Sequence, residues 1–144
     1  MTSWAYFDTS VLVKRYIKED GSSEARRLLK SHRLLTSMIA LTEAISALSR
    51  RCTLGELERH HFIEILRKLK ADSAYWEFVE ISLLLLKEVN DVIINTELRI
   101  LDVLHLASIL MFQSVSGLHL PLRTSDKKQR EAAVKLDIET VWVG

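Results

Sequence analysis

Trp4-Ala5-Tyr6-Phe7-Asp8 is a run of four apolar and aromatic residues that stops at an acid. A short run that is apolar on both faces and bounded by polar residues predicts a strand buried on both sides. Buried strands of this kind belong to parallel sheets that are covered by helices on both faces. In such sheets, functional sites form at the carboxyl ends of the strands, so Asp8 stands where chemistry is expected.

The rest of the chain repeats this alternation of short apolar runs and helical periodicity. Further strands are predicted at residues 34–36, 78–81, 119–124 and 140–143. Helices are predicted at residues 10–17, 22–31, 38–51, 54–71, 83–95, 100–115 and 126–135. Thr9 or Ser10 is the expected N-cap of the first helix, Thr53 caps the fourth, and Gly117 ends the sixth. This pattern predicts an α/β fold with a parallel sheet covered on both faces.

Length and composition limit the class of protein. A chain of 144 residues, 48% of them hydrophobic, fits one domain, residues 1–144, with a substantial core. One cysteine cannot form a disulfide framework or a cysteine-rich zinc site, and it fits a reducing, cytoplasmic setting. The net charge of +1 is not the strongly basic signature expected of a nucleic-acid-binding domain.

Neither a signal peptide nor a membrane span is expected. The N-terminal residues carry no basic segment ahead of an apolar stretch. Residues 103–122 hold no Asp, Glu, Lys or Arg over about the length of a membrane span. However, the polar residues and Pro121 inside that segment predict a helix end, a turn and a strand instead.

Three acids are candidates from the residues alone. Asp8 and Asp126 each follow a predicted strand and should lie at the same edge of the sheet, although an Asp in that position also caps the next helix. Asp102 lies in a helix that is apolar nearly all round. An isolated buried carboxylate is too costly to leave uncompensated, so Asp102 is exposed at the helix start, paired, protonated or bound to a metal.

Helical periodicity alone does not indicate a functional role for Glu43 or for the histidines. Glu43 falls opposite the apolar stripe of its helix, which predicts a solvated side chain. That stripe comprises Met38, Leu41, Ile45 and Leu48. His105 lies three residues after Asp102, on the same helix face, and is interpreted as a structural histidine. His60 and His61 are interpreted as partly buried packing residues.

Four segments, in order and spacing along essentially the whole chain, resemble PIN-domain ribonucleases. The one around Asp102 closely resembles the third-acid helix of the VapC toxins within that family. The segments are Phe7-Asp8-Thr9-Ser10-Val11-Leu12-Val13, Thr42-Glu43-Ala44-Ile45, Leu98-Arg99-Ile100-Leu101-Asp102-Val103-Leu104-His105-Leu106-Ala107 and Arg123-Thr124-Ser125-Asp126.

The resemblance implies a PIN-like three-layer α/β/α sandwich with a central, mostly parallel sheet of four to five strands. It also implies a metal-dependent endoribonuclease that hydrolyses RNA phosphodiester bonds. The catalytic, Mg²⁺- or Mn²⁺-binding set would be Asp8, Glu43, Asp102 and Asp126. Hydroxyls that fix the carboxylates would come from Thr9, Ser10 and Thr124. Some family members carry a further acid after the fourth, but Lys127 and Lys128 stand there in this chain, which weakens a second metal site.

The resemblance further implies an RNA substrate, a VapB-type antitoxin partner and a homodimer. Basic residues near the acids in sequence are candidate RNA contacts, although each taken singly fits a solvated surface charge. The candidates are Lys14, Arg15, Arg50, Arg99, Arg123 and Lys127. Arg51 and Lys128 are close to the acids in the same way.

Two other classes of function are compatible with parts of the sequence. A PIN-like RNA-binding or scaffold module that does not cut would keep the fold, but the intact set of four acids favours the enzyme. A receiver-type phosphoryl-transfer domain would use Asp8 as phospho-acceptor. It ranks last, because such domains place paired acids before the end of the first strand and the residues before Asp8 are apolar.

Overall fold

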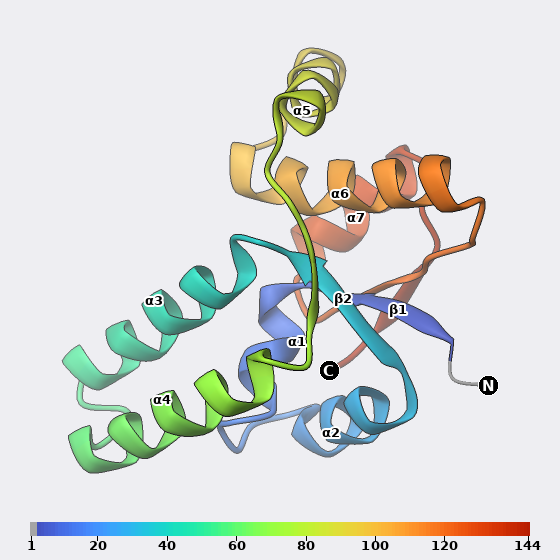
Figure 1. The fold of residues 1–144 in the computed structure, drawn as a ribbon. Coiled ribbons are helices and arrows are strands. Elements are labelled where there is room, and N and C mark those ends of the chain that lie inside the picture. The colour runs from blue at the N-terminus through green and yellow to red at the C-terminus, as the bar shows by residue number, and fades with distance from the viewer. Residues whose placement is uncertain (1–2) are drawn as a thin grey trace.

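A five-stranded parallel sheet lies between two layers of helices in the computed structural model, which describes residues 3–144 (Figure 1). The strands are β1 (Trp4–Phe7), β2 (Arg33–Ser37), β3 (Glu77–Val79), β4 (Leu122–Thr124) and β5 (Thr140–Trp142). Their order is β3-β2-β1-β4-β5, and all neighbouring pairs are parallel. The predicted α/β class and the mostly parallel sheet of four to five strands are therefore confirmed.

The helices divide between the two faces of the sheet (Figure 1). They are α1 (Thr9–Lys14), α2 (Ser22–Ser31), α3 (Ala40–Thr53), α4 (Arg59–Ser73), α5 (Leu83–Thr96), α6 (Ile100–Ser116) and α7 (Lys127–Lys135). Ala5 and Phe7 of β1 pack against α1 and α2 on one face, whereas Tyr6 packs against α6 and α7 on the other. Helices α3 and α4 pack on α1, and α5 packs on α6. The result is the three-layer α/β/α arrangement that was expected.

The central position of β1 places its carboxyl end at the switch point of the sheet. The chain adds β2 and β3 on one side of β1 and later returns to add β4 and β5 on the other side. Two neighbouring strands whose following helices cross to opposite faces leave an opening at their carboxyl ends. Asp8 and Asp126, which follow β1 and β4, lie at this opening.

Several element boundaries differ from the prediction. Thr53 does not cap a helix: α3 runs through it, and α4 begins only at Arg59. Gly55, at φ +78°, allows the chain to turn there, and its N–H donates to the carbonyl of Cys52. The N-cap of α1 is Asp8 rather than Thr9 or Ser10. Gly117 ends α6, as predicted.

Burial corrects two of the predicted packing faces. On α3 the buried residues are Ala40, Ala44 and Leu48, while Met38 precedes the helix and is 48% exposed. The prediction that His60 and His61 are partly buried packing residues is wrong, because both are exposed at the start of α4. The buried residues of α4 are Phe62, Ile65 and Leu69.

Within residues 3–144, no helix taken by itself is long and apolar enough to cross a membrane. Helices α5 and α6 meet the length and composition criteria only as a pair, with a bend of 118° between them.

Candidate active site

Asp8 is buried at the carboxyl end of β1, and both of its oxygens are hydrogen-bonded. Oδ1 accepts from the Ser10 N–H at 3.1 Å, the Ser10 hydroxyl at 2.5 Å and the Val11 N–H at 3.4 Å. Oδ2 accepts from the Thr124 hydroxyl at 2.5 Å. Burial raises the pKa of Asp8, and His105 and these hydrogen bonds oppose that rise. The carboxylate is thus fixed in one orientation at the switch point.

Asp126 follows β4 and caps α7, while its side chain remains exposed. Its Oδ1 accepts from the N–H groups of Lys128 at 2.9 Å and Gln129 at 3.2 Å. The Asp126 N–H donates to Thr124 Oγ1 at 3.0 Å, and the same hydroxyl donates to Asp8. Asp126 therefore caps α7 and also lies at the sheet edge. Thr124 hydrogen-bonds to both acids, to the side chain of Asp8 and to the N–H of Asp126.

Asp102 lies in the first turn of α6 and is half-buried. Its pKa is raised, first by burial and then by the negative charges of Asp126 and Glu43, while His105 and Arg99 oppose the rise. Three acids from separate segments are thus close enough to influence one another. Gln129 helps to hold this arrangement, because its Nε2 donates to the Asp102 carbonyl at 3.2 Å and so links α7 to α6.

Glu43 is not the solvated side chain that periodicity predicts. It lies in the first turn of α3 with its side chain 21% exposed. Its Oε1 accepts from the Thr9 hydroxyl at 2.9 Å and from His105 Nε2 at 2.7 Å. Glu43 flanks the buried residues of α3, and Thr9 of α1 and His105 of α6 cover it there.

A buried chain of hydrogen bonds supports Glu43 from behind. Tyr6 Oη lies 2.7 Å from His105 Nδ1, and the exposed fractions of the two residues are 0% and 4%. Because a carboxylate only accepts, His105 Nε2 carries the hydrogen that points to Glu43. In the neutral ring, Nδ1 then accepts from the Tyr6 hydroxyl. Sequence reasoning missed Tyr6; the spacing of three between Asp102 and His105 was the available signal for His105.

The three hydroxyls expected beside the acids each donate to one of them. Thr9 donates to Glu43, and Ser10 and Thr124 donate to Asp8. Such contacts restrict carboxylate rotamers and lower the cost of presenting several acids to one cation.

The donor set at this edge suits a hard divalent cation. Its oxygens come from Asp8, Glu43, Asp102 and Asp126, and carboxylate oxygens are the ligands that Mg²⁺ and Mn²⁺ prefer. The rise in the pKa of Asp102 caused by Asp126 and Glu43 indicates negative charge that a cation would offset. The residues present therefore fit such an ion.

The basic candidates are more scattered than their sequence positions suggest. Lys14 is paired with Glu19 at 3.2 Å. Arg123 is 9% exposed, and its Nη2 donates to His32 Nε2 at 3.3 Å. This burial argues against Arg123 as an RNA contact. Arg50, Arg99 and Lys127 are exposed, and Arg99 is near enough to Asp102 to lower its pKa.

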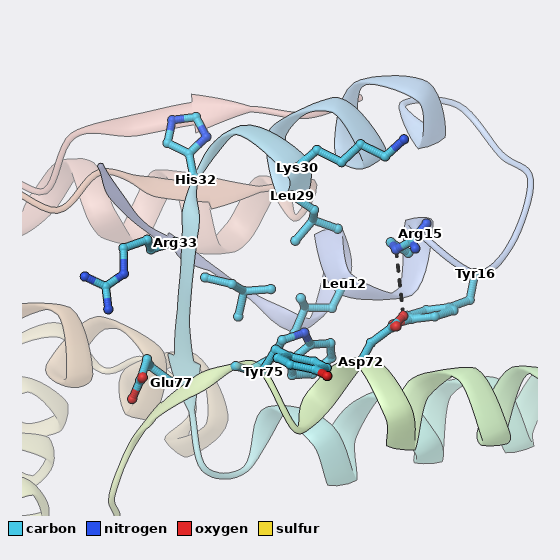
Figure 2. A pocket seen from close by; sticks show the side chains of 12 residues that line it. Leu12, Arg15, Tyr16, Leu29, Lys30, His32, Arg33, Asp72, Tyr75 and Glu77 are labelled. Carbon is cyan, nitrogen blue, oxygen red and sulfur yellow. Dashed lines mark hydrogen bonds and ion pairs between the residues drawn. The ribbon is translucent and has the colours of Figure 1, made fainter. Parts of the chain in front are cut away.

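Arg15 lies in a separate cleft of about 370 Å³ between α1, α2 and the end of α4 (Figure 2). Its Nε is 3.9 Å from Asp72 Oδ2, and Tyr16 donates to the same oxygen at 2.6 Å. None of the four acids is among the residues that line this cleft in the described part of the chain. Arg15 is therefore not joined to the acid cluster.

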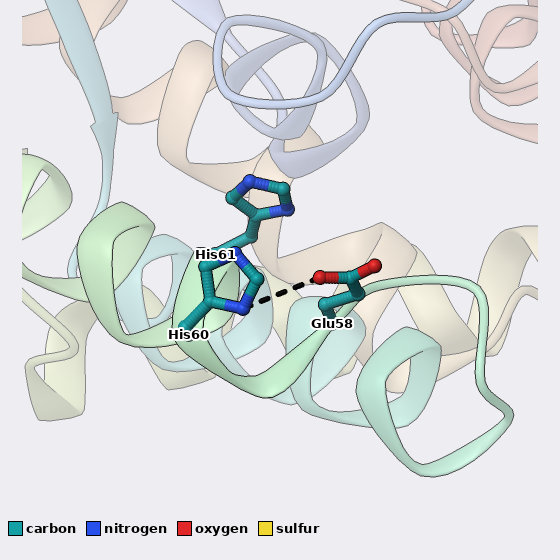
Figure 3. Close-up of side chains that lie close together, drawn as sticks. All are labelled: Glu58, His60 and His61. Atoms are coloured by element: carbon teal, nitrogen blue, oxygen red, sulfur yellow. Dashed lines mark ion pairs between the residues drawn. The ribbon is translucent and has the colours of Figure 1, made fainter.

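In the described residues, no three of the four acids bring their ligand atoms within 4.8 Å of one another, whereas a different group does. Among the residues that the structure describes, Glu58, His60 and His61 have ligand atoms that all lie within 4.8 Å of one another (Figure 3). All three are exposed at the start of α4, and an ion pair of 3.2 Å between His60 Nδ1 and Glu58 Oε2 accounts for much of the closeness. This group is separate from the four acids.

The raised pKa of Asp102 has a consequence for stability. A raised folded-state pKa means that protonation stabilises the fold; this gain is fully present below the ordinary value of 3.8 and is lost as pH rises through the raised pKa. In chelator at neutral pH, Asp102→Asn should therefore have a higher Tm than the unsubstituted protein. The difference should shrink as pH falls and vanish near 3.8. Thermal melts across this range test it; a difference that stays constant with pH would contradict it.

Comparison with known families agrees with this geometry. The model of the PIN domain matches residues 5–135, so the chain belongs to the PIN-domain family. Its structural neighbours include a VapC toxin, a VapBC complex and a further toxin–antitoxin complex. A comparison with curated proteins finds no match.

Three solved structures illustrate the likeness, each at 16% sequence identity. Mycobacterium tuberculosis VapC20, a Sarcin-Ricin loop cleaving toxin, has a TM-score of 0.65 over 89% of this chain and 94% of its own. A toxin–antitoxin complex from Klebsiella pneumoniae has a TM-score of 0.64 over 87% and 88%. VapBC2 from Rickettsia felis, bound to a promoter DNA fragment, has a TM-score of 0.63 over 95% and 96%. At this identity, the likeness establishes the fold.

Proposed function

We propose that the protein is a metal-dependent endoribonuclease and the toxin of a toxin–antitoxin pair. The observation that carries the proposal is that four acids from distant segments of a PIN-domain chain are linked near the carboxyl edge of β1 and β4 by shared hydrogen-bond partners and by the effect of their charges on one another. These acids are Asp8, Glu43, Asp102 and Asp126. The network of hydroxyls and His105 behind them is what a site built to hold a cation requires.

The roles of the residues follow from their surroundings. The four acids would hold Mg²⁺ or Mn²⁺, and such an ion, when bound, lowers the pKa of a water and offsets negative charge on the phosphate. Asp8 keeps its orientation through Ser10 and Thr124. Glu43 uses Oε1 for Thr9 and His105, which leaves Oε2 for a ligand. Lys127 and Lys128, exposed next to Asp126, are placed to approach RNA phosphates.

The partners are proposed on the same basis. An antitoxin of the VapB type is suggested by the neighbours that are toxin–antitoxin complexes. The exposed apolar side chains of α5, including Leu83, Leu84 and Ile94, offer a surface for an antitoxin or for a second copy in a homodimer. A cytoplasmic location fits the single cysteine and an RNA substrate.

Removal of metal is the direct test of this function. Purified protein should cleave a labelled structured RNA in Mn²⁺ or Mg²⁺, and excess chelator should stop cleavage until the metal is restored. Asp102→Asn should be inactive, whereas Asp91→Asn, which changes an exposed acid of α5, should behave as the unsubstituted protein. Gel analysis of the RNA reports both.

Two results would overturn parts of the proposal. Equal cleavage in excess chelator would exclude the metal mechanism. RNA binding without cleavage in either metal would favour the module that does not cut.

A further inference from the structure

A cleft of about 250 Å³ opens between α1, α3 and the loop before α7; among the described residues none of the four acids lines it, but residues that hydrogen-bond to two of them do. One side is formed by Thr9, Ser10 and Ser125, and the other carries Lys14, Glu19 and Arg51. The first side is shared with the acid cluster, because Thr9 donates to Glu43 and Ser10 donates to Asp8. The Ser125 N–H donates to Ser10 Oγ at 2.9 Å and closes this wall.

Glu19 holds the two cations of the cleft in place. Its Oε1 is 3.2 Å from Lys14 Nζ, and its Oε2 is 3.0 Å from Arg51 Nη2. Lys14 Nζ also donates to the Asp20 carbonyl at 2.6 Å, and the side chain of Lys14 is only 12% exposed. Two cations and one carboxylate leave this wall with an excess of positive charge.

Both cations retain hydrogen-bond donors that the cluster does not use. The ammonium of Lys14 has three donors, of which two point to Glu19 and Asp20. The guanidinium of Arg51 has five N–H donors, and its bond to Glu19 uses one nitrogen, Nη2. The remaining donors of Arg51 match the planar, two-oxygen geometry of a phosphate.

We propose that this cleft binds a phosphate of the RNA backbone next to the one that is cut, with Lys14 and Arg51 as its donors and Glu19 as the carboxylate that pairs with both donors in the free protein. The inference rests on the proposed ribonuclease function. A polyanion approaching four carboxylates needs local cations, and this pair lines a cleft together with Thr9 and Ser10, which hydrogen-bond to Glu43 and Asp8. Arg50, the neighbour that sequence proximity favoured, is exposed and does not line the cleft.

Substitution of the two cations tests the assignment. In an Asp102→Asn background, where RNA should stay intact, Arg51→Gln and Lys14→Gln should each weaken binding of a fluorescent single-stranded RNA roughly tenfold. The slope of log affinity against log salt should fall by about 0.7 for each lost contact. With the acids intact, KM should rise and kcat should change little. Anisotropy titrations and initial rates give these values.

Arg27→Gln is the matched control, because Arg27 pairs with Glu24 in the same way but on the exposed surface of α2. Lys14→Arg keeps the charge and should restore most of the affinity. Since Lys14 is mostly covered, thermal melts check that Lys14→Gln folds; Arg51, whose side chain is 37% exposed, provides the second variant.

Glu19→Gln should change RNA affinity in the opposite direction to the two cation variants. Loss of this carboxylate raises the positive charge of the cleft, so RNA affinity should increase at low salt while thermal stability falls. A purely structural ion cluster would lose stability in all three variants without changing RNA affinity, and that result would overturn the phosphate site. Unchanged affinity in Arg51→Gln, with normal cleavage by the unsubstituted protein, would overturn it and leave the ribonuclease proposal standing. Failure of the unsubstituted protein to bind RNA would overturn both.

Discussion

Asp8→Asn is expected to abolish both Mn²⁺ binding and RNA cleavage while leaving the protein folded. Asp8 is the most buried of the four acids, at 4% exposed, and it is fixed by hydrogen bonds on both oxygens. Replacing a supporting residue beside a metal ligand costs about 10–100-fold in affinity or activity. Because Asp8→Asn removes the ligand charge itself, Mn²⁺ affinity and cleavage activity should fall by more than this range.

The fold should tolerate this substitution because the asparagine amide can use the same partners. Its oxygen can accept from Ser10 and Val11, and its amide nitrogen can donate to the Thr124 hydroxyl. That hydroxyl can then turn toward the Asp126 carbonyl, 3.5 Å away. Burial raises the pKa of Asp8, so removing the charge should leave the metal-free protein at least as stable.

Calorimetric Mn²⁺ titration, RNA cleavage and thermal melts together test this prediction. Asp8→Ala is the contrasting variant, since it leaves Ser10 and Thr124 without their acceptor and should lower the Tm. Asp91→Asn controls for the loss of an acid elsewhere. Retention of Mn²⁺ binding by a folded Asp8→Asn protein would remove Asp8 from the metal site.

Local sequence patterns were sufficient to predict the type of each secondary-structure element and the position of Asp8 at the end of the first strand. An apolar run followed by an acid is a short-range signal, and the alternation of strands and helices restricts the fold to a covered parallel sheet. The strand order β3-β2-β1-β4-β5 does not follow from those patterns, because which strands pair depends on contacts far apart in the chain. The turn at Gly55 shows the same limit on a small scale: Thr53 had the chemistry of a cap, but the helix continued through it.

Glu43 shows why periodicity alone misplaced part of the site. The apolar stripe predicted for this helix put Glu43 on the opposite, solvated face, but the residues of α3 that are buried are Ala40, Ala44 and Leu48, and Glu43 flanks them. Its partners, Thr9 and His105, are 34 and 62 residues away in sequence. Only the family resemblance placed Glu43 with the other acids.

Arg123 shows the opposite error, in which proximity in sequence was mistaken for proximity in space. It lies between Leu122 and Thr124 on β4, so its side chain points to the other face of the sheet from Thr124. Strand alternation was a signal that could have excluded it. Arg51 and Arg50 are also neighbours in sequence, and only the packing of α3 on α1 distinguishes them.

His105→Phe is expected to weaken Mn²⁺ binding by about 10–100-fold, because it removes the support of Glu43 rather than a ligand. The phenyl ring should keep the edge-on packing with Tyr6, whose ring centroid is 5.7 Å from that of His105. However, it removes the bond from the fully buried Tyr6 hydroxyl to His105 and leaves Glu43 with Thr9 alone. Loss of this bond at a buried hydroxyl should lower the free energy of unfolding by about 1 kcal/mol.

Two further variants separate positioning from stability. Tyr6→Phe removes the hydroxyl but keeps the bond between His105 Nε2 and Glu43, so it should affect Mn²⁺ affinity less than His105→Phe. Ser108→Ala is the contrasting variant, since Ser108 is one turn further along α6, is fully buried, donates to the Leu104 carbonyl at 2.6 Å and neighbours the Tyr6 hydroxyl, but is not a hydrogen-bond partner of Glu43. It should lose stability but not Mn²⁺ affinity. Calorimetry and urea unfolding measure both quantities. Equal Mn²⁺ affinity in His105→Phe and Ser108→Ala would mean that His105 only supports the fold, as its sequence position first indicated.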